Sequence, residues 1–324
     1  MNIFKDKKIL IIGDVMLDSY LFGNVDRISP EAPVPVVDVI VKQDKLGGAA
    51  NVATNIKNLG GTPILCSVIG KDHKSEIFLS LLKKLKIKTD YIILSENRIT
   101  TNKTRIIGNN HQMLRVDEEV KNELGVDQNA FINIIDYAFE NEDLDCILFQ
   151  DYDKGIINES LISYITNKGQ SLNIPIIVDP KKNNFSSYKN VTLFKPNFKE
   201  FKEGINLTIS NSDRKELLET GAKILHKKGI EIVFVTLSEN GIFVSYKKDK
   251  KIINKIIPGT AIEVVDVSGA GDSVISLVSL LLGEMNIEEI ARIANIAGGM
   301  ACEEIGVVPI DKDKLIKKIK ELEN

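Results

Sequence analysis

One stretch of the sequence combines a tight turn, a helix start and two carboxylates. It reads Asp266-Val267-Ser268-Gly269-Ala270-Gly271-Asp272, and an apolar run continues from it to Leu282. The small residues predict a turn that opens a helix. The N–H groups of Gly269, Ala270 and Gly271 would lack intrahelical partners there and could bind an anion. Asp272 would lie beside that anion and could accept a proton from an attacking hydroxyl, which is the minimum that phosphoryl transfer to an alcohol requires.

Outward from this stretch, short apolar runs alternate with amphipathic segments along the chain. The alternation predicts an α/β fold, with a doubly wound, mainly parallel sheet and helices on both of its faces. Strands are expected at Lys8–Gly13, Ile64–Ile69, Cys146–Phe149, Pro175–Asp179, Val191–Phe194 and Ile232–Thr236, with a hairpin at Gly241–Tyr246 and Lys251–Ile256. Helices are expected at Gly48–Leu59, His73–Leu85, Gln128–Glu140, Glu159–Leu172, Asp213–Lys228, Ala270–Leu282, Ile287–Cys302 and Asp311–Leu322.

Two regions differ from this alternation. Tyr20–Val41 alternates polar and apolar residues and contains three prolines, which suits strands outside the main sheet. Three short extended runs follow later, at Tyr91–Leu94, Thr100–Ile107 and Gln112–Val116. We expect these runs to form a small antiparallel lid sheet, drawn from about residues 17–42 and 90–118 of a single domain that spans 1–324.

Composition excludes several functional classes. Lys+Arg 42 against Asp+Glu 45 gives a net charge of −3, which implies no general attraction to nucleic acid or acidic membranes. Cys66, Cys146 and Cys302 are far apart among apolar neighbours and predict buried thiols in a reducing compartment. The three histidines share no metal-ligand spacing, and the first apolar run is too short for a signal or a membrane span. We expect a cytoplasmic protein.

Polar residues follow five of the expected strands. They are Asp14, Asp151, Asp179-Pro180-Lys181, Lys195-Pro196-Asn197 and Thr236. Ligands of open α/β sheets bind beyond the carboxyl ends of the strands, so this pattern marks a cleft. Helix capping explains any one of these residues alone, but five in register favour a site.

Two further motifs each admit two interpretations. Gly47-Gly48-Ala49-Ala50-Asn51 opens the first long helix; its small residues would let a ligand approach Asn51, or would simply form a turn. Asn197 and Glu200 lie three apart at an expected helix start. The pair could hold magnesium through water, or could be an N-cap with an acidic first turn. No Gly-x-x-x-x-Gly-Lys-Ser/Thr run occurs, which excludes a P-loop.

Taken together, the two glycine-rich motifs and Asn197-Phe198-Lys199-Glu200 resemble the ribokinase-type (PfkB) carbohydrate kinases over the whole chain. The resemblance implies ATP-dependent phosphorylation of a sugar-like hydroxyl and a β lid often used for homodimerisation. It implies ATP and magnesium as cofactors, and it leaves a monovalent cation open. It further implies that Asp272 is the base and that the anion hole is formed by Gly269, Ala270 and Gly271. The residues implied to contact the sugar are Asp14, Gly47, Gly48 and Asn51. Those implied to bind ATP are Lys195, Asn197, Thr236, Ser238, Gly241 and Asn295, and Glu200 would hold magnesium through water.

A narrower resemblance points to the heptose 7-phosphate kinases. It is carried by Gly13–Asp18, Arg27–Val36, Thr104–Asn110, Leu114–Glu118, and Asp151-Tyr152 with Lys154-Gly155. Those enzymes phosphorylate the anomeric hydroxyl and are often fused to an adenylyltransferase bearing His-x-Gly-His. None of the three histidines here fits that motif, so we expect the kinase part alone. A 7-phosphate would need cationic partners, for which Lys103, Arg105, Arg115, Arg27 and Lys154 are candidates.

Other functions stay open at this point. The acceptor could be ribose, fructose, a fructose phosphate or a nucleoside. Alternatively, the chain could be a sugar- or nucleotide-binding regulator without catalytic activity. Retention of Asp272 beside the whole anion cradle favours an enzyme, because binding alone needs no base.

Overall fold

A computed structural model describes residues 4, 6–206, 213–260, 264–304 and 306–323. Within these residues nine strands form one large sheet, in the order β13-β12-β11-β10-β9-β8-β1-β4-β5. All neighbouring pairs are parallel except β11–β12 and β12–β13. The strands are β1 (Lys8–Gly13), β4 (Thr62–Gly70), β5 (Ile92–Ser95), β8 (Cys146–Gln150), β9 (Ile176–Asp179), β10 (Leu193–Phe194), β11 (Ile232–Thr236), β12 (Ile242–Lys248) and β13 (Lys251–Ile257).

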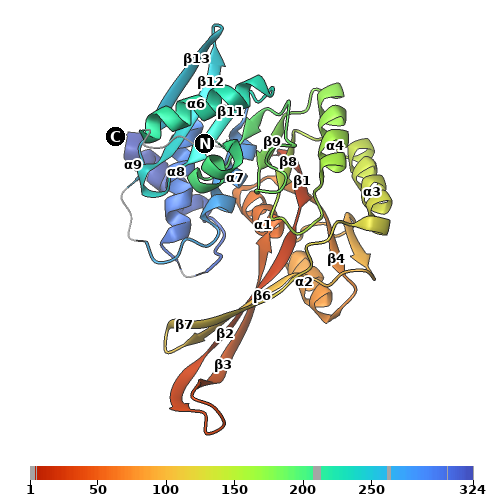
Figure 1. The fold of residues 1–324 in the computed structure, drawn as a ribbon, viewed down its shortest axis with the longest axis vertical. Coiled ribbons are helices and arrows are strands. Elements are labelled where there is room, and N and C mark those ends of the chain that lie inside the picture. Colours follow the sequence, from red (N-terminus) through yellow and green to blue (C-terminus); the bar gives the residue numbers. More distant parts are fainter. Residues whose placement is uncertain (1–3, 5, 207–212, 261–263, 305, 324) are drawn as a thin grey trace.

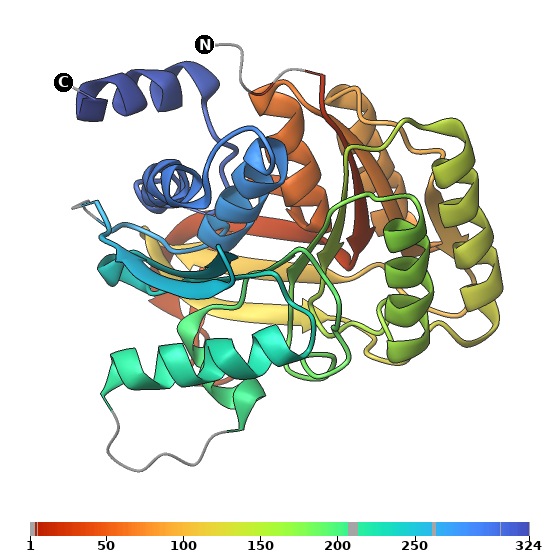
Figure 2. The ribbon, with the colours of Figure 1, turned by 90° about the horizontal axis from the view of Figure 1, so that it is seen from above.

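Helices cover both faces of this sheet (Figure 2). Alternate residues of β1 enter two separate cores: Ile9 and Ile11 pack on one side, and Leu10 and Ile12 on the other. The first core takes α1, α2, α7, α8 and α9, and the second takes α3, α4, α5 and α6. The helices are α1 (Ala49–Leu59), α2 (His73–Lys84), α3 (Gln128–Asn141), α4 (Glu159–Ser171), α5 (Phe198–Ile205), α6 (Arg214–Lys227), α7 (Ala270–Leu281), α8 (Ile287–Cys302) and α9 (Lys312–Glu323). The expected doubly wound architecture is confirmed.

A second, four-stranded sheet projects from the body (Figure 1). Its order is β3-β2-β6-β7, with β2 (Val15–Ile28), β3 (Pro35–Gly48), β6 (Asn102–Gly108) and β7 (His111–Glu118). The sheet is mixed rather than antiparallel, because β2 and β6 run parallel. We call these four strands the projecting sheet.

One expectation for this region was wrong. Tyr91–Leu94 was assigned to the small sheet, but β5 pairs in parallel with β4 at the edge of the large sheet. Tyr91 is buried in the core that also contains α3. Short apolar runs carry no signal for their partner strand, and here burial of Tyr91 selects the large sheet.

Local signals agree with the structure at several termini. Gly60 ends α1 in the left-handed conformation, at φ 105°. The lysine-rich segment after β12 is the tip of the β12–β13 hairpin, where Lys248 pairs with Lys251. All three cysteines are free and buried. Among the described residues, none of the helices combines the length and apolar character needed to span a bilayer.

Candidate active site

The carboxyl ends of the parallel strands meet the N-terminus of α7. Backbone hydrogen bonds tie consecutive strand ends together, from Asp14 N–H to the Gln150 carbonyl and from Asp151 N–H to the Asp179 carbonyl. Lys195 N–H donates to the Val178 carbonyl. These bonds bring residues far apart in the sequence to one edge of the sheet, as expected of a cleft there.

Asp272 lies in the first turn of α7 and is only 5% exposed. Its carboxylate faces polar groups rather than the apolar core. Asn51 Nδ2 donates to Oδ2 at 2.8 Å, Tyr152 Oη donates to Oδ1 at 2.6 Å, and Gln150 Nε2 donates to Oδ1 at 3.2 Å. Burial raises the pKa of Asp272 to about 6, although the Tyr152 and Asn51 hydrogen bonds act in the opposite direction. A carboxylate with this pKa can accept a proton near neutral pH.

The turn before α7 leaves its amides accessible. Gly269 is the N-cap at φ 81°, and no side chain caps the helix. Within the described part of the chain, the Gly271 and Asp272 amides have no acceptor, and the Ala270 amide has only a long contact of 3.4 Å to the Val267 carbonyl. A Cβ at Gly271 would meet only Lys195 Nζ, at 3.8 Å. The amides are therefore open to an anion beside a lysine.

Asp266 fixes this turn from its other end. Its carboxylate accepts the Ser268 N–H at 3.0 Å and the Ser268 hydroxyl at 2.8 Å. Its second oxygen accepts the Gly306 N–H at 2.8 Å. The two aspartates that flank the glycines therefore have different environments. Asp266 stabilises the turn, and Asp272 faces the cleft.

Asp14, for which a contact with the sugar is predicted, is held by backbone N–H groups of the segment after β8. It is 1% exposed and accepts the N–H groups of Tyr152, Lys154 and Ile156 at 2.8, 3.2 and 3.3 Å. Burial raises its pKa despite these three bonds. Asp14 thus anchors the segment after β8, which carries Tyr152 to Asp272.

The Gly47-Gly48 pair is also explained by packing within the chain. A Cβ at Gly47 would lie 2.3 Å from Asp18 Oδ2, and one at Gly48 would lie 2.5 Å from the Asp14 carbonyl. The small residues let β3 approach β2; approach of a ligand to Asn51 stays a prediction. Asn51, in the first turn of α1, does reach the cleft through its bond to Asp272.

Arg105 and Lys154 lie at the base of the projecting sheet and each has an acidic partner. Arg105 pairs with the buried Asp18, a residue the sequence did not single out. Lys154 Nζ lies 2.6 Å from a Glu119 oxygen, and Lys103 Nζ lies 3.5 Å from the same oxygen. Lys121 adds a third ammonium at 3.2 Å from Glu119. Lys103 also lies 3.1 Å from Asp117, so three ammonium groups and two carboxylates leave this cluster with a net charge of +1.

The end of β10 and the start of α5 carry another group of expected site residues, namely Lys195, Asn197 and Glu200. Lys195 is 2% exposed, and its Nζ lies 3.0 Å from Asp179 Oδ2. Asn197 and Glu200 form a capping box: each side chain accepts the other residue's N–H at 2.9 Å. Lys181 pairs with the second carboxylate oxygen of Glu200. The pair therefore caps α5, and the water-mediated magnesium contact stays a prediction. Among the described residues there is no group of three or more His, Cys, Asp or Glu that could hold a metal.

The other residues that were expected to bind ATP lie at or after the end of β11 or in α8. Thr236 forms an isolated bridge with Asn197. Gly241 has φ 88°, and a Cβ there would lie 2.0 Å from the Ile257 carbonyl. Asn295 of α8 donates to the Pro258 carbonyl at 3.0 Å. Ser238 begins the short helix between Thr236 and Gly241.

Four residues near Asp272 were not assigned a role from the sequence. They are Gln150, Tyr152, Asp179 and Lys181. Asp179 and Lys181 belong to the strand-end pattern that marked the cleft, whereas Gln150 at the end of β8 and Tyr152 just after it were not part of that pattern. Tertiary contacts decide which polar side chain at a strand end points toward Asp272. The sequence does not reveal these contacts.

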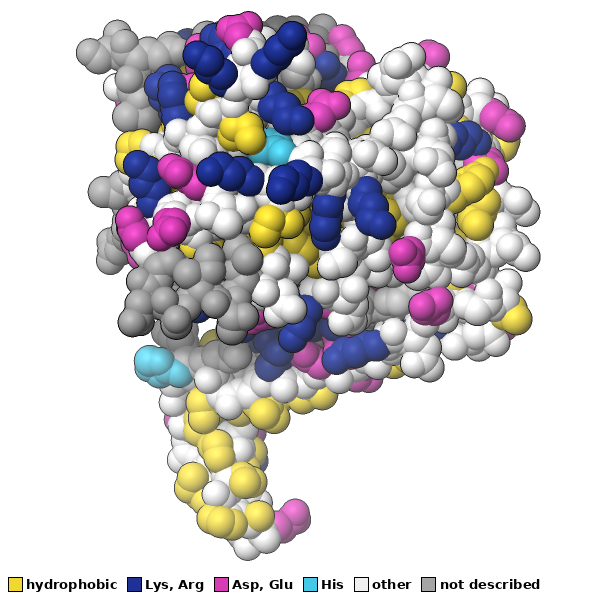
Figure 3. Space-filling model, turned by 45° about the horizontal axis from the view of Figure 1, so that its top comes forward, with side chains coloured by type: hydrophobic (Ala, Val, Ile, Leu, Met, Phe, Trp, Pro, Cys, Tyr) yellow, Lys and Arg dark blue, Asp and Glu magenta, His cyan; other side chains and the backbone are white. Residues whose placement is uncertain are grey.

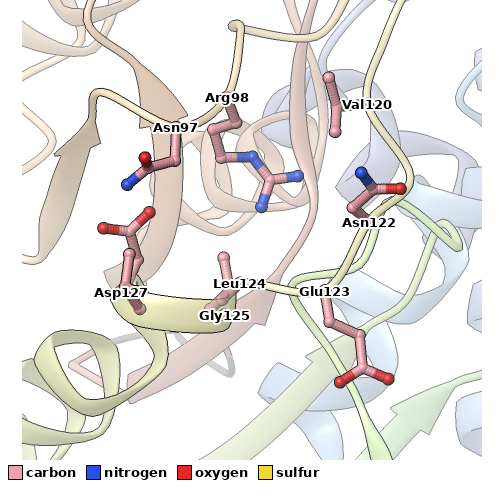
Figure 4. Close-up of a pocket in the computed structure, with 9 residues that line it drawn as sticks. Asn97, Arg98, Val120, Asn122, Glu123, Leu124, Gly125 and Asp127 are labelled. Carbon is pink, nitrogen blue, oxygen red and sulfur yellow. The ribbon is translucent and has the colours of Figure 1, made fainter.

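A pocket of about 250 Å³ lies between the loop that carries Asn97 and Arg98 and residues 120–127 (Figure 4). Arg98 points into it and donates to the Lys154 carbonyl at 2.7 Å. Glu123 and Asp127 also line the pocket. Because Asp272 does not line this pocket, the cleft at α7 is the candidate site, and Arg98 holds the segment after β8 through the Lys154 carbonyl.

Comparison with known proteins gives the following relationships. A model described as pfkB family carbohydrate kinase matches residues 6–313. The bifunctional protein HldE of Aliarcobacter butzleri is 37% identical over 313 residues, 96% of this chain and 64% of its own length. That of Helicobacter pylori is 37% identical over 303 residues, 93% of this chain and 64% of its own length. The chain thus spans less than two thirds of these relatives.

Solved structures show the same fold at low identity. Phosphofructokinase-2 from Escherichia coli in complex with potassium superposes with a TM-score of 0.78 at 20% identity, over 98% of this chain and all of that one. Ribokinase from Arabidopsis thaliana complexed with ribose and ATP gives 0.70 at 17% identity, over 98% of this chain and 99% of that one.

Proposed function

The chain belongs to the pfkB family of carbohydrate kinases, and on this premise we propose that it transfers the γ-phosphoryl group of ATP to the anomeric hydroxyl of D-glycero-D-manno-heptose 7-phosphate. Membership makes it a phosphotransferase with a sugar hydroxyl as acceptor. The site residues, the heptose and the anomeric position belong to the proposal. The observation that carries it is the buried carboxylate of Asp272 beside the open amides of the α7 turn.

In this mechanism Asp272 accepts the proton of the sugar hydroxyl as its oxygen attacks phosphorus. Asn51 holds the second carboxylate oxygen at 2.8 Å, so the base keeps a fixed orientation. The amides of Gly269 to Gly271, together with Lys195, face the charge that develops on the transferred group. The adenine and ribose would lie along Thr236, Ser238, Gly241 and Asn295.

Magnesium would bind chiefly to the nucleotide's phosphates and to water, since this ion keeps much of its hydration shell. Glu200 is the protein group that fits such an outer position, at the start of α5. Its oxygens are engaged by Asn197 N–H and Lys181, so contact with the ion requires Lys181 to leave. The ion would supply neutralisation of the phosphate charge. Because phosphofructokinase-2 from Escherichia coli forms a complex with potassium, the test of this proposal also includes a monovalent cation.

The cations at Glu119 support a substrate that already carries a phosphate. Lys103 comes from β6 of the projecting sheet and Lys154 from the segment after β8, and both side chains are mostly buried. Lys154 N–H also bonds to Asp14, in the segment that carries Tyr152 to Asp272. A phosphate distant from the reacting hydroxyl would find two ammonium groups here. The HldE relatives, 37% identical, favour the heptose among sugar phosphates.

The projecting sheet would act as a lid over the sugar and exclude water that competes as acceptor. We further propose that its apolar surface pairs with a second copy of the chain. Side chains exposed on this sheet include Ile28, Val39, Ile40, Val41, Met113, Leu114 and Val116, and apolar groups cover it in Figure 3. A one-layer sheet with this surface needs a partner to bury it. Use of ATP fits a cytoplasmic place of action.

A substrate panel tests the proposal. ADP release is measured with heptose 7-phosphate, heptose, fructose 6-phosphate, fructose, ribose and adenosine, each with magnesium and with or without potassium. We expect the highest kcat/KM for heptose 7-phosphate. A higher value for any other acceptor would replace the heptose, and binding without turnover across the panel would favour a regulator.

A further inference from the structure

Lys181 lies between Glu200, on the proposed nucleotide side of the site, and Tyr152, which contacts the proposed base Asp272. It follows Asp179 and Pro180 at the end of β9, and its ammonium pairs with Glu200 at the start of α5. The same ammonium lies 5.3 Å from the centroid of the Tyr152 ring. The hydroxyl of that ring donates to Asp272 at 2.6 Å. Lys181 therefore lies beside both the proposed nucleotide side and the proposed base.

The surroundings keep this lysine charged. Burial alone would lower the pKa of Lys181, but the nearby carboxylates of Asp179, Glu200 and Asp272 outweigh burial and raise it. Lys195, the other lysine near Asp272, is held by Asp179 and only 3% of its side chain is exposed. The Lys181 side chain is 29% exposed and has a flexible four-carbon stem. Of these two ammonium groups, that of Lys181 is the one free to follow a moving charge.

Local structure does not need this lysine. The capping box already fixes Glu200, because Asn197 N–H donates to it at 2.9 Å. Partly exposed ion pairs contribute little to folding stability. The Lys181–Glu200 pair is therefore a poor candidate for a purely structural contact.

We propose that Lys181 is a catalytic cation whose ammonium contacts the phosphoryl group during its transfer. This inference rests on the phosphoryl transfer at Asp272 proposed above. The bond between the γ-phosphorus and the bridging oxygen of ADP breaks, and a bond from phosphorus to the sugar oxygen forms. The hydroxyl proton goes to Asp272, and Lys181 keeps its proton throughout. Negative charge on the equatorial oxygens of the phosphoryl group must be stabilised as the group passes from ADP to the sugar, and a cation close to these oxygens does so.

The test compares Lys181→Met and Lys181→Arg with Lys182→Met, which removes the adjacent exposed lysine. Steady-state kinetics are measured with the best acceptor of the panel. Calorimetry measures the affinity for ADP alone and for ADP with aluminium fluoride and the sugar, which imitates the transferring group. We expect Lys181→Met to lower kcat about 10²–10³-fold, the range typical of a lost electrostatic stabiliser. Affinity for the aluminium fluoride complex should fall by a similar factor while affinity for ADP stays within about threefold.

Lys181→Arg should recover part of both losses because it restores a cation, and Lys182→Met should match the parent protein. A kcat within about threefold of the parent in Lys181→Met would overturn the inference. So would an equal loss of affinity for ADP alone, which would place Lys181 in ground-state nucleotide binding. If Lys181→Met does not fold, Lys181→Gln undergoes the same measurements. The variant Asp272→Asn, measured in the same assay, separates the two proposals. Full activity of Asp272→Asn would reject Asp272 as the base. If Asp272→Asn is inactive and Lys181→Met is active, only the role of Lys181 is rejected.

Discussion

The phenolic hydroxyl of Tyr152 donates a hydrogen bond of 2.6 Å to Oδ1 of Asp272. The backbone N–H of the same tyrosine donates to Asp14 at 2.8 Å, so the buried Asp14 fixes the segment that carries the ring. The contact joins residues 120 positions apart in the sequence. The contact places the Tyr152 hydroxyl next to the proposed base. An attacking sugar hydroxyl must bind Asp272 beside this phenol or displace it.

Replacement of Tyr152 by Phe should shift the pH dependence of the reaction. The base works as a carboxylate, so kcat/KM should fall as the pH drops through the pKa of Asp272, at about 6. The Tyr152 hydrogen bond lowers that pKa against the stronger effect of burial. Its loss should therefore move the acid limb of the profile to higher pH, while activity at pH 8 changes less. The measurement is kcat/KM from pH 5 to 9.

Tyr164→Phe provides the matched control, since it removes a phenol that bonds to Asp136 on the surface. Its profile should coincide with that of the parent. An acid limb in Tyr152→Phe that stays in place or moves to lower pH would contradict the assignment of Asp272 as the titrating base.

Asp272→Asn should reduce kcat at least a hundredfold, because loss of a general base typically costs about two to four orders of magnitude. The amide keeps the shape of the side chain, so ATP affinity measured by calorimetry should stay within a few-fold. Asp90→Asn, which changes an exposed acid, is the control and should leave kcat unchanged. Turnover of Asp272→Asn near that of the control would show that another group accepts the proton.

Lys154→Met should act on phosphorylated acceptors selectively. The lysine lies 2.6 Å from Glu119 beside Lys103, and in the proposal it binds the substrate's distant phosphate. We expect KM for the sugar phosphate to rise about tenfold or more, with KM for the same sugar without phosphate unchanged. Lys121→Met removes the exposed lysine on the same glutamate and should have little effect. Equal changes for both kinds of acceptor would indicate that Lys154 does not distinguish the phosphate.

The sequence predicted eight of the nine strands of the main sheet and, apart from α5, the described α-helices to within a few residues. Buried parallel strands stand out as continuous apolar runs, and amphipathic helices have a periodic pattern. The sequence placed Tyr91–Leu94 in the wrong sheet, since four apolar residues do not specify a partner strand. The Asp272 turn was recognisable because glycine, position in a helix and charge are local properties. The anchoring role of Asp14 and the contact from Tyr152 were not, because each depends on the path of the segment after β8.

The two glycines of the α7 turn should respond differently to substitution. Gly269 has φ 81°, so Gly269→Ala strains the turn and should lower both thermal stability and turnover. A Cβ at Gly271 meets nothing nearer than Lys195 Nζ at 3.8 Å, so Gly271→Val should fold with a stability change of about 1 kcal/mol or less. Its side chain would occupy the space beside the amides and raise KM for ATP at least tenfold. Differential scanning fluorimetry and kinetics measure the two effects; a normal KM for ATP in Gly271→Val would contradict the anion cradle.

Association through the projecting sheet should depend on one of its apolar faces. Leu21, Ile106 and Leu114 are register partners on β2, β6 and β7, so they point to the same side, and Leu114 is 55% exposed. If a second copy covers this side, Leu114→Asp buries a charge in the interface and should yield monomers at concentrations where the parent is a dimer.

Light scattering coupled to size-exclusion chromatography measures the mass over a range of concentrations. Leu172→Asp changes a leucine of similar exposure, 50%, at the end of α4 and should leave the mass unchanged. Because the lid joins the body through Lys103, Lys154 and Glu119, loss of the dimer should also raise KM for the sugar more than KM for ATP. A parent protein that is monomeric at all concentrations, or a Leu114→Asp variant that remains dimeric, would reject this face as the interface.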